Sequence, residues 1–162
     1  MSEKISVLLV SGEPESFAPL KSLLQSQSLE TREVPSCGEA LLVLWGKQPP
    51  HLVFTDTQLP DGTWAEVVSL AGKAQAPSNV IVVSRLVDVK LYVEAIERGA
   101  FDFITPPFEA RELRHIVRRA TEDVLERRAI ARRNRENSAT TPDKESTRPP
   151  EGLMAALDPA AT

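Results

Sequence analysis

Short apolar runs alternate along this chain with longer segments in which apolar residues recur every three or four positions. The short runs are typical of strands, and the longer spacing is typical of helices that pack by one face. The runs predict strands at residues 5–10, 31–34, 52–55, 80–83 and 101–104. The helical spacing predicts helices at residues 15–25, 35–45, 64–74 and 88–98, and a long helix from about residue 109. Five strand–helix units with short connections predict an α/β fold, in which a doubly wound five-stranded parallel sheet lies between two layers of helices.

The final helix and the residues after it divide the chain into parts. An apolar stripe on this helix predicts packing on the sheet, and it consists of Leu113, Ile116, Val117, Ala120 and Val124. Beyond the stripe, apolar residues are sparse among arginines, and from about Asn137 the sequence is rich in Ser, Thr, Pro and charge. We therefore expect a domain at residues 1–122, an extension of the C-terminal helix at 123–136 and a disordered tail at 137–162.

Composition narrows the class of protein. Of the 162 residues, 41% are hydrophobic and 26% are charged, as in ordinary globular proteins. The apolar runs are far shorter than the roughly 20 residues of a membrane-spanning helix, and the N-terminus does not resemble a secretory signal. The single cysteine, Cys37, allows no internal disulfide. These features predict a cytoplasmic protein that does not enter a membrane.

Charge is distributed unevenly along the chain. Residues 1–110 carry 8 basic and 14 acidic side chains, whereas residues 111–136 carry nine arginines and five acids. An acidic body argues against nucleic acid as the partner. The basic helix is either a docking surface, including one for a homodimer, or a solvated extension.

The polar residues that follow each strand are the candidates for chemistry, because open α/β sheets bind ligands at the carboxyl ends of their strands. Asp56 ends a buried central strand, and a turn over Leu59–Gly62 follows it. The other strand ends supply Ser11, Gly12 and Glu13, then Ser84, then Thr105, Pro106 and Pro107.

Four segments in this order, VLLV, LVFTDTQLPDG, VIVVS and GAFDFITPPFEARELRHIV, resemble the receiver domain of bacterial response regulators. The resemblance covers about residues 4–122 and implies a flavodoxin-like sandwich. It implies that Asp56 accepts a phosphoryl group from a histidine kinase with the help of Mg²⁺. It also implies that Ser84 and Phe103 are switch residues and that the peptide bond before Pro107 is cis. Each residue also has a simpler interpretation: Asp56 as a turn cap, Ser84 as a strand-end serine and Phe103 as a core aromatic.

The site departs from the family pattern at three positions. Two adjacent acids usually follow the first strand, but Ser11 and Gly12 stand there, and Glu13 is the only acid nearby. Pro106 stands in place of the family's lysine and has neither charge nor a donor. Asp56 and Glu13 are therefore the only candidate Mg²⁺ ligands, and Glu13 is also explained as a solvated helix-start residue.

These departures favour a degenerate, stand-alone receiver that acts by protein–protein contact and is weakly phosphorylated or not phosphorylated. The alternative is a functional receiver in which Glu13 helps to bind Mg²⁺ and a kinase modifies Asp56. An enzyme is disfavoured, because phosphatases of the haloacid dehalogenase type need a second aspartate two residues after the first. Gln58 stands at that position here.

Overall fold

The computed structural model describes residues 4–140, with side chains up to residue 137. The strands are β1 (Ser6–Val10), β2 (Glu30–Val34), β3 (Leu52–Asp56), β4 (Gln58–Leu59), β5 (Gly62–Thr63), β6 (Asn79–Val83) and β7 (Asp102–Ile104). The helices are a 3₁₀ turn, η1 (Pro14–Phe17), and α1 (Ala18–Ser26), α2 (Cys37–Leu44), α3 (Trp64–Lys73), α4 (Val89–Glu97) and α5 (Ala110–Thr140).

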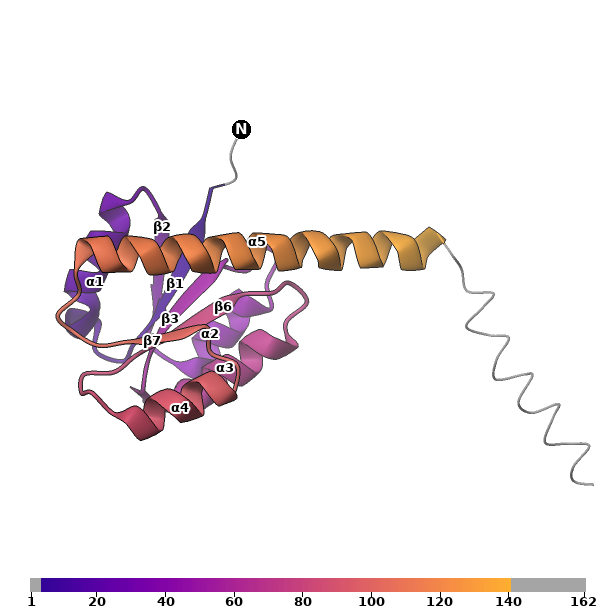
Figure 1. Ribbon diagram of the computed structural model, residues 1–162. Helices are drawn as coiled ribbons and strands as arrows, with labels where there is room; N and C mark the ends of the chain where they lie inside the picture. The colour runs from indigo at the N-terminus through magenta and orange to yellow at the C-terminus, as the bar shows by residue number, and fades with distance from the viewer. Residues whose placement is uncertain (1–3, 141–162) are drawn as a thin grey trace, which may run out of the picture. The chain divides into compact units, whose positions relative to one another are not determined.

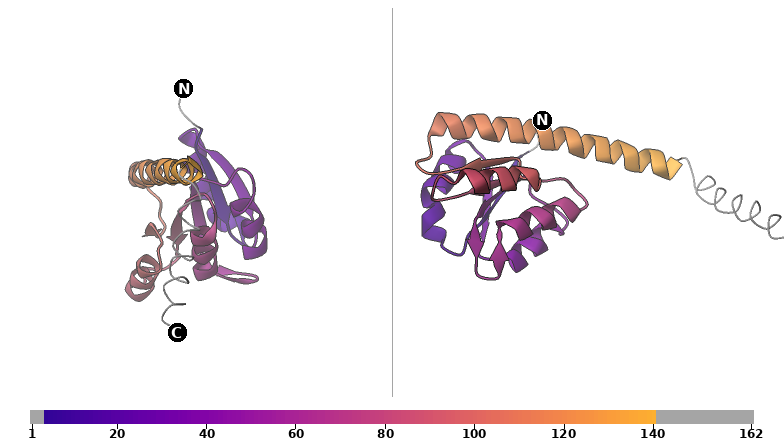
Figure 2. Two further views of the ribbon diagram at one scale, coloured as in Figure 1. Left: turned by 90° about the vertical axis from the view of Figure 1, so that its right-hand side faces the viewer. Right: turned by 60° about the horizontal axis from the view of Figure 1, so that its bottom comes forward.

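The five longer strands form one parallel sheet in the order β2-β1-β3-β6-β7 (Figure 1). Helices α2, α3 and α4 cover one face of it, and α1 and the first part of α5 cover the other (Figure 2). Each face has its own apolar core. Leu8, Val10 and Val53 point to the first, whereas Leu9, Phe54 and Ile81 point to the second. The predicted doubly wound, three-layer α/β sandwich is confirmed.

The central strands are apolar because both of their faces are covered. All five residues of β3 and all five of β6 are buried. The edge strand β2 differs, because only Val34 at its end is buried. Asp56 is thus the last residue of a strand that is covered on both faces, which places its carboxylate at one edge of the sheet.

Local signals in the sequence explain where several helices begin and end. The hydroxyl of Ser36 accepts a hydrogen bond from the N–H of Glu39 at the start of α2, and Asp88 does the same for Leu91 at the start of α4. Gly99 follows α4 with φ 111°, a left-handed conformation that favours glycine and ends the helix.

The segment after β3 is more ordered than the predicted turn. Strands β4 and β5 pair in antiparallel register, with Gln58 opposite Thr63 and Leu59 opposite Gly62. Strands of two residues are too short to show an alternation of apolar and polar positions, so the sequence pattern could not predict this hairpin. The carboxylate of Asp61 at its tip accepts hydrogen bonds from the N–H groups of Cys37 (2.8 Å) and Gly38 (2.9 Å). In addition to the cap from Ser36, α2 therefore receives a second cap from Asp61 on the hairpin.

The final helix continues to Thr140, four residues past the predicted end at 136. Residues 137–140 contain no proline, and the first one after them is Pro142, so nothing in this stretch forces the helix to end. The rest of the predicted disordered tail lies outside the described residues. The first compact unit of the chain ends at Arg127, beyond the boundary predicted at residue 122.

A polar clamp explains this later boundary. The side-chain amide of Asn79 donates hydrogen bonds to the carbonyl of Ala120 (2.8 Å) and to Asp123 Oδ2 (3.0 Å). Arg127 donates to Asn79 Oδ1 and, through Nε, to Asp123 at 2.9 Å. The apolar stripe ends at Val124, which is buried. The clamp holds α5 against the start of β6 as far as Arg127, about one turn further.

Among the described residues, no helix is both long and apolar enough to cross a membrane.

Candidate functional site

The strand register brings the predicted site residues to one edge of the sheet. Val10 pairs with Thr55, so Ser11 lies beside Asp56 on the neighbouring strand. Asp56 pairs with Val83, so Ser84 follows on the other side, and its N–H donates to the carbonyl of Ile104 (2.9 Å). Ser11, Asp56 and Ser84 therefore lie at the ends of three adjacent strands, as the sequence predicts.

Asp56 is held by hydrogen bonds on both carboxylate oxygens. Oδ1 accepts from the N–H of Thr57 (2.8 Å), and Oδ2 accepts from the hydroxyl of Ser11 (3.3 Å). The Asp56 side chain is only 8% exposed. A nearly buried carboxylate needs such partners, because an unpaired charge is costly away from water.

A cation that the sequence analysis did not identify completes the site. Nη2 of Arg85 lies 3.6 Å from Asp56 Oδ2 and forms an ion pair with Glu13 Oε1. Both carboxylates raise the pKa of Arg85, Glu13 more than Asp56. Pro106 still leaves the position of the family's lysine without a charge, but Arg85 brings a cation to the site from the loop after β6. Arg85 directly follows Ser84, so extending the survey of strand ends by one residue would have found it.

The loop after β1 is shaped by Ser11 rather than by acids. The Ser11 hydroxyl lies 3.0 Å from the carbonyl of Glu13, as well as within reach of Asp56, and its oxygen accepts from the N–H of Glu13 (3.1 Å). Gly12 has little room for a side chain, since an added Cβ would lie 3.0 Å from Cδ of Pro60. Placing an acid at Gly12 would therefore require the Pro60 ring to move by a few tenths of an ångström.

The two predicted switch residues have other partners in this structure. The Ser84 hydroxyl donates to the carbonyl of Leu86 (2.8 Å) within its own loop. Phe103 is partly buried and meets Tyr92 edge to face, with ring centroids 5.7 Å apart. Phe103 thus links β7 to α4. The peptide bond between Pro106 and Pro107 is cis, as predicted.

The residues around Asp56 do not fit a magnesium ion. Mg²⁺ needs near-octahedral oxygen ligands at about 2.0–2.1 Å. Among the residues that the structure describes, Glu13 is the acid that shares a cation with Asp56, and its carboxylate is paired with Arg85. Within residues 4–137, no group of three or more His, Cys, Asp or Glu side chains could hold a metal ion.

Cys37 is buried at the start of α2 and is not poised for chemistry. Burial, and then the charges of Asp61 and Glu66, raise the pKa of its thiol to about 11. A thiol in this state is a poor nucleophile at neutral pH. Cys37 is therefore a residue of the apolar core on the face of the sheet that α2 covers.

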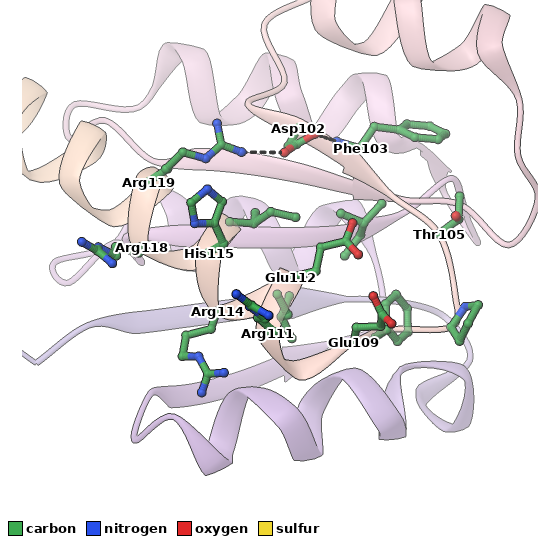
Figure 3. A pocket seen from close by; sticks show the side chains of 15 residues that line it. Asp102, Phe103, Thr105, Glu109, Arg111, Glu112, Arg114, His115, Arg118 and Arg119 are labelled. Atoms are coloured by element: carbon green, nitrogen blue, oxygen red, sulfur yellow. Dashed lines mark hydrogen bonds and ion pairs between the residues drawn. The ribbon is translucent and has the colours of Figure 1, made fainter.

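A separate groove of about 860 Å³ lies between β7 and the first turns of α5 (Figure 3). Its lining is strongly charged and includes Asp102, Glu112, Arg111, His115 and Arg119. Arg119 donates to Asp102 across the groove (3.3 Å). Asp56 does not line this groove, so the groove is separate from the strand-end site.

Comparison with known proteins agrees with the fold and the strand-end site. Residues 7–118 match the response regulator receiver domain family. The transcriptional regulatory protein KdpE of Mycobacterium tuberculosis is 34% identical over 120 residues, which are 71% of this chain and 52% of KdpE. The response regulator protein PilR of Pseudomonas aeruginosa is 30% identical over 110 residues, which are 68% of this chain and 24% of PilR. This chain thus spans about half or less of the length of these relatives.

Solved structures support the same fold. The signal receiver domain of an HD domain-containing protein from Pseudomonas fluorescens has a TM-score of 0.70 at 21% identity, covering 80% of this chain and 95% of that one. A CheY-like receiver domain protein from Methanospirillum hungatei has a TM-score of 0.65 at 18% identity, covering 77% and 99%. With the family match over residues 7–118, the chain belongs to the response regulator receiver domain family of two-component signalling.

Proposed function

We propose that this chain is a degenerate, cytoplasmic receiver module that acts by protein–protein contact, is not an enzyme, and is phosphorylated weakly or not at all on Asp56. Receiver domains in general bind Mg²⁺ and interact with histidine kinases and other signalling proteins. The observation that carries the proposal is the pairing of both candidate metal ligands, Asp56 and Glu13, with Arg85.

The chemistry of phosphoryl transfer explains why this pairing matters. Transfer to a carboxylate depends on cations that neutralise the charge of the phosphoryl group. Here the position of the family's lysine is Pro106, which has no charge, and Arg85 is already shared between two acids. Compared with the family pattern, the site lacks an acidic Mg²⁺ ligand after β1 and the lysine after β7. Each lost charge-assisted contact is worth roughly 1.5–3 kcal/mol, so we expect these two losses to slow transfer on the order of 10²-fold or more.

The surface of α4 and β7 supports a role in protein contact. Val89, Val93 and Ile96 on α4 are exposed large apolar residues, and Tyr92 beside them contacts Phe103 of β7. Exposed apolar residues that cluster on one face are typical of protein-binding surfaces. The charged groove between β7 and α5 lies next to this face along the same edge strand.

The alternative function is that of a working phosphoacceptor. The position of Asp56 at the end of β3, next to the Ser11 hydroxyl and the Arg85 cation, favours it. In this case a kinase modifies Asp56, and Glu13 must leave Arg85 to help bind Mg²⁺.

Labelling by a small phosphoryl donor separates the two functions. We expect little modification of Asp56 by acetyl phosphate, with or without Mg²⁺, when the intact protein is followed by mass spectrometry. Asp56→Asn defines the background, and Asp61→Asn is a matched control that removes a nearby acid outside the site. Fast labelling that requires Mg²⁺ and disappears in Asp56→Asn alone would refute the degenerate function and establish the alternative.

A further inference from the structure

Arg85 brings a positive charge to the place where two carboxylates face each other. Its Nη2 atom pairs with Glu13 Oε1 and lies 3.6 Å from Asp56 Oδ2. The three residues come from three separate segments: the loop after β1, the end of β3 and the loop after β6. One nitrogen atom therefore serves both acids at once.

This cation is permanently charged. An arginine side chain does not lose its proton at any physiological pH, and the two acids raise the pKa of Arg85 further. The positive charge that Arg85 brings to the site therefore depends neither on a bound metal nor on the pH. The chain itself thus offsets one of the two negative charges at the site.

We propose that Arg85 is a built-in counter-ion that excludes divalent cations from Asp56. This inference rests on the proposed function, because it identifies what replaces the metal in a degenerate receiver. A divalent cation bound to Asp56 Oδ2 would lie within a few ångströms of the guanidinium, where two positive charges repel strongly near a protein surface. To use Glu13 as a second ligand, the divalent cation would also have to break the ion pair between Glu13 and Arg85.

The proposal predicts that removing the charge of Arg85 creates a metal site. We expect Arg85→Gln to bind Mn²⁺ about tenfold more tightly than the natural chain, or more, because repulsion is relieved and Glu13 becomes available. Mn²⁺ serves as a probe because it is paramagnetic. The full chain is titrated with Mn²⁺, the free ion is followed by electron paramagnetic resonance, and the broadened amide signals of Glu13, Asp56 and Thr57 locate the ion.

Three further variants make the result specific. Arg85→Lys keeps the positive charge and should stay close to the natural affinity. Lys21→Gln removes a positive charge from the ion pair with Glu33, outside the site, and should leave Mn²⁺ affinity unchanged. Adding Glu13→Gln to Arg85→Gln should reduce the gain, because only the relief of repulsion is then left.

The outcomes separate this inference from the proposed function. Equal Mn²⁺ affinity of the natural chain and Arg85→Gln would overturn the inference, and so would an equal gain in Lys21→Gln. The titration uses no phosphoryl donor, so efficient phosphorylation of the natural chain would overturn the proposed function without being mistaken for a change in metal affinity.

Discussion

Single residues determine the character of the site more than the fold does. Asp56 occupies a position that the sequence identifies without difficulty, because a buried apolar run leads directly to it. Arg85, Glu13 and Gly12 decide what this carboxylate can do. Their effect depends on the loops around them, including the contact between the position of Gly12 and the ring of Pro60. Sequence spacing alone does not define such contacts.

Asp61 is a residue whose structural role can be tested through pH. Its carboxylate accepts two backbone hydrogen bonds at the start of α2, and these bonds hold its pKa below the ordinary value of 3.8. A carboxyl group with a lowered pKa in the folded state stabilises the fold above the unfolded pKa, and this stability is lost as the pH falls through the folded pKa. We expect Asp61→Ala to lower Tm by a few degrees at pH 7.

The difference in Tm should shrink as the pH falls below 3.8, where the natural chain loses the same stabilisation. Thermal unfolding from pH 7 to pH 3, followed by circular dichroism, measures this difference. Asp88→Ala removes the cap of α4 and serves as a control at the start of another helix. A difference for Asp61→Ala that stays constant with pH would show that its charge is not involved.

The candidate site could be predicted from the sequence only in part. The strand ends were identified correctly, and the structure brings Asp56, Ser11 and Ser84 together as this predicted. The hydrogen bonds of Ser84 and the pairing of Arg85 were not identified, because loop conformation decides which neighbour a polar side chain reaches. The role of Asp61 was hidden for the same reason, since its partners Cys37 and Gly38 are more than 20 positions away.

Among the elements, α5 departs most from the prediction. Apolar periodicity predicted the part that packs on the sheet, but not the polar clamp that extends this packing to Arg127. Polar clamps of this kind carry no periodicity. The five strands of the parallel sheet and the other helices were predicted to within a few residues. The two-residue strands β4 and β5 were not predicted, because they are too short to show a pattern.

The clamp should contribute measurably to stability. Asn79→Ala removes both donors to α5 and leaves Arg127 without one acceptor, so we expect a loss of roughly 1–3 kcal/mol in the free energy of unfolding. Urea denaturation measures this loss. Asp123→Ala acts on the same network, and the double variant should lose less than the sum of the two single changes. Additive losses would show that the two residues act independently.

Across the whole molecule, the described residues after Arg127 raise the question of self-association. Half of residues 128–137 are charged, and the segment includes Ile130, which is 41% exposed. We expect this part of α5 to support a homodimer or to dock a partner. A chain that ends at Arg128 keeps Val124 and the clamp, so its Tm should not change, while any dimer seen by sedimentation should be lost.

Ile130→Glu offers a second test that preserves the length of the helix. Placing a charge on the one large apolar side chain of this segment should weaken the dimer without changing the Tm of the first unit. A dimer that persists in both variants would move the interface to the face of α4 and β7.

The two open edges of the sheet limit how this molecule can assemble. An unpaired edge strand is a template for the addition of a strand from another chain, and charged side chains oppose such pairing. On β2, Glu30 and Glu33 form ion pairs with Lys4 and Lys21, and Arg32 is exposed. The opposite edge, β7, is three residues long and carries Asp102 paired with Arg119. Strand-to-strand aggregation is therefore opposed at both edges, and association between copies is left to the helices.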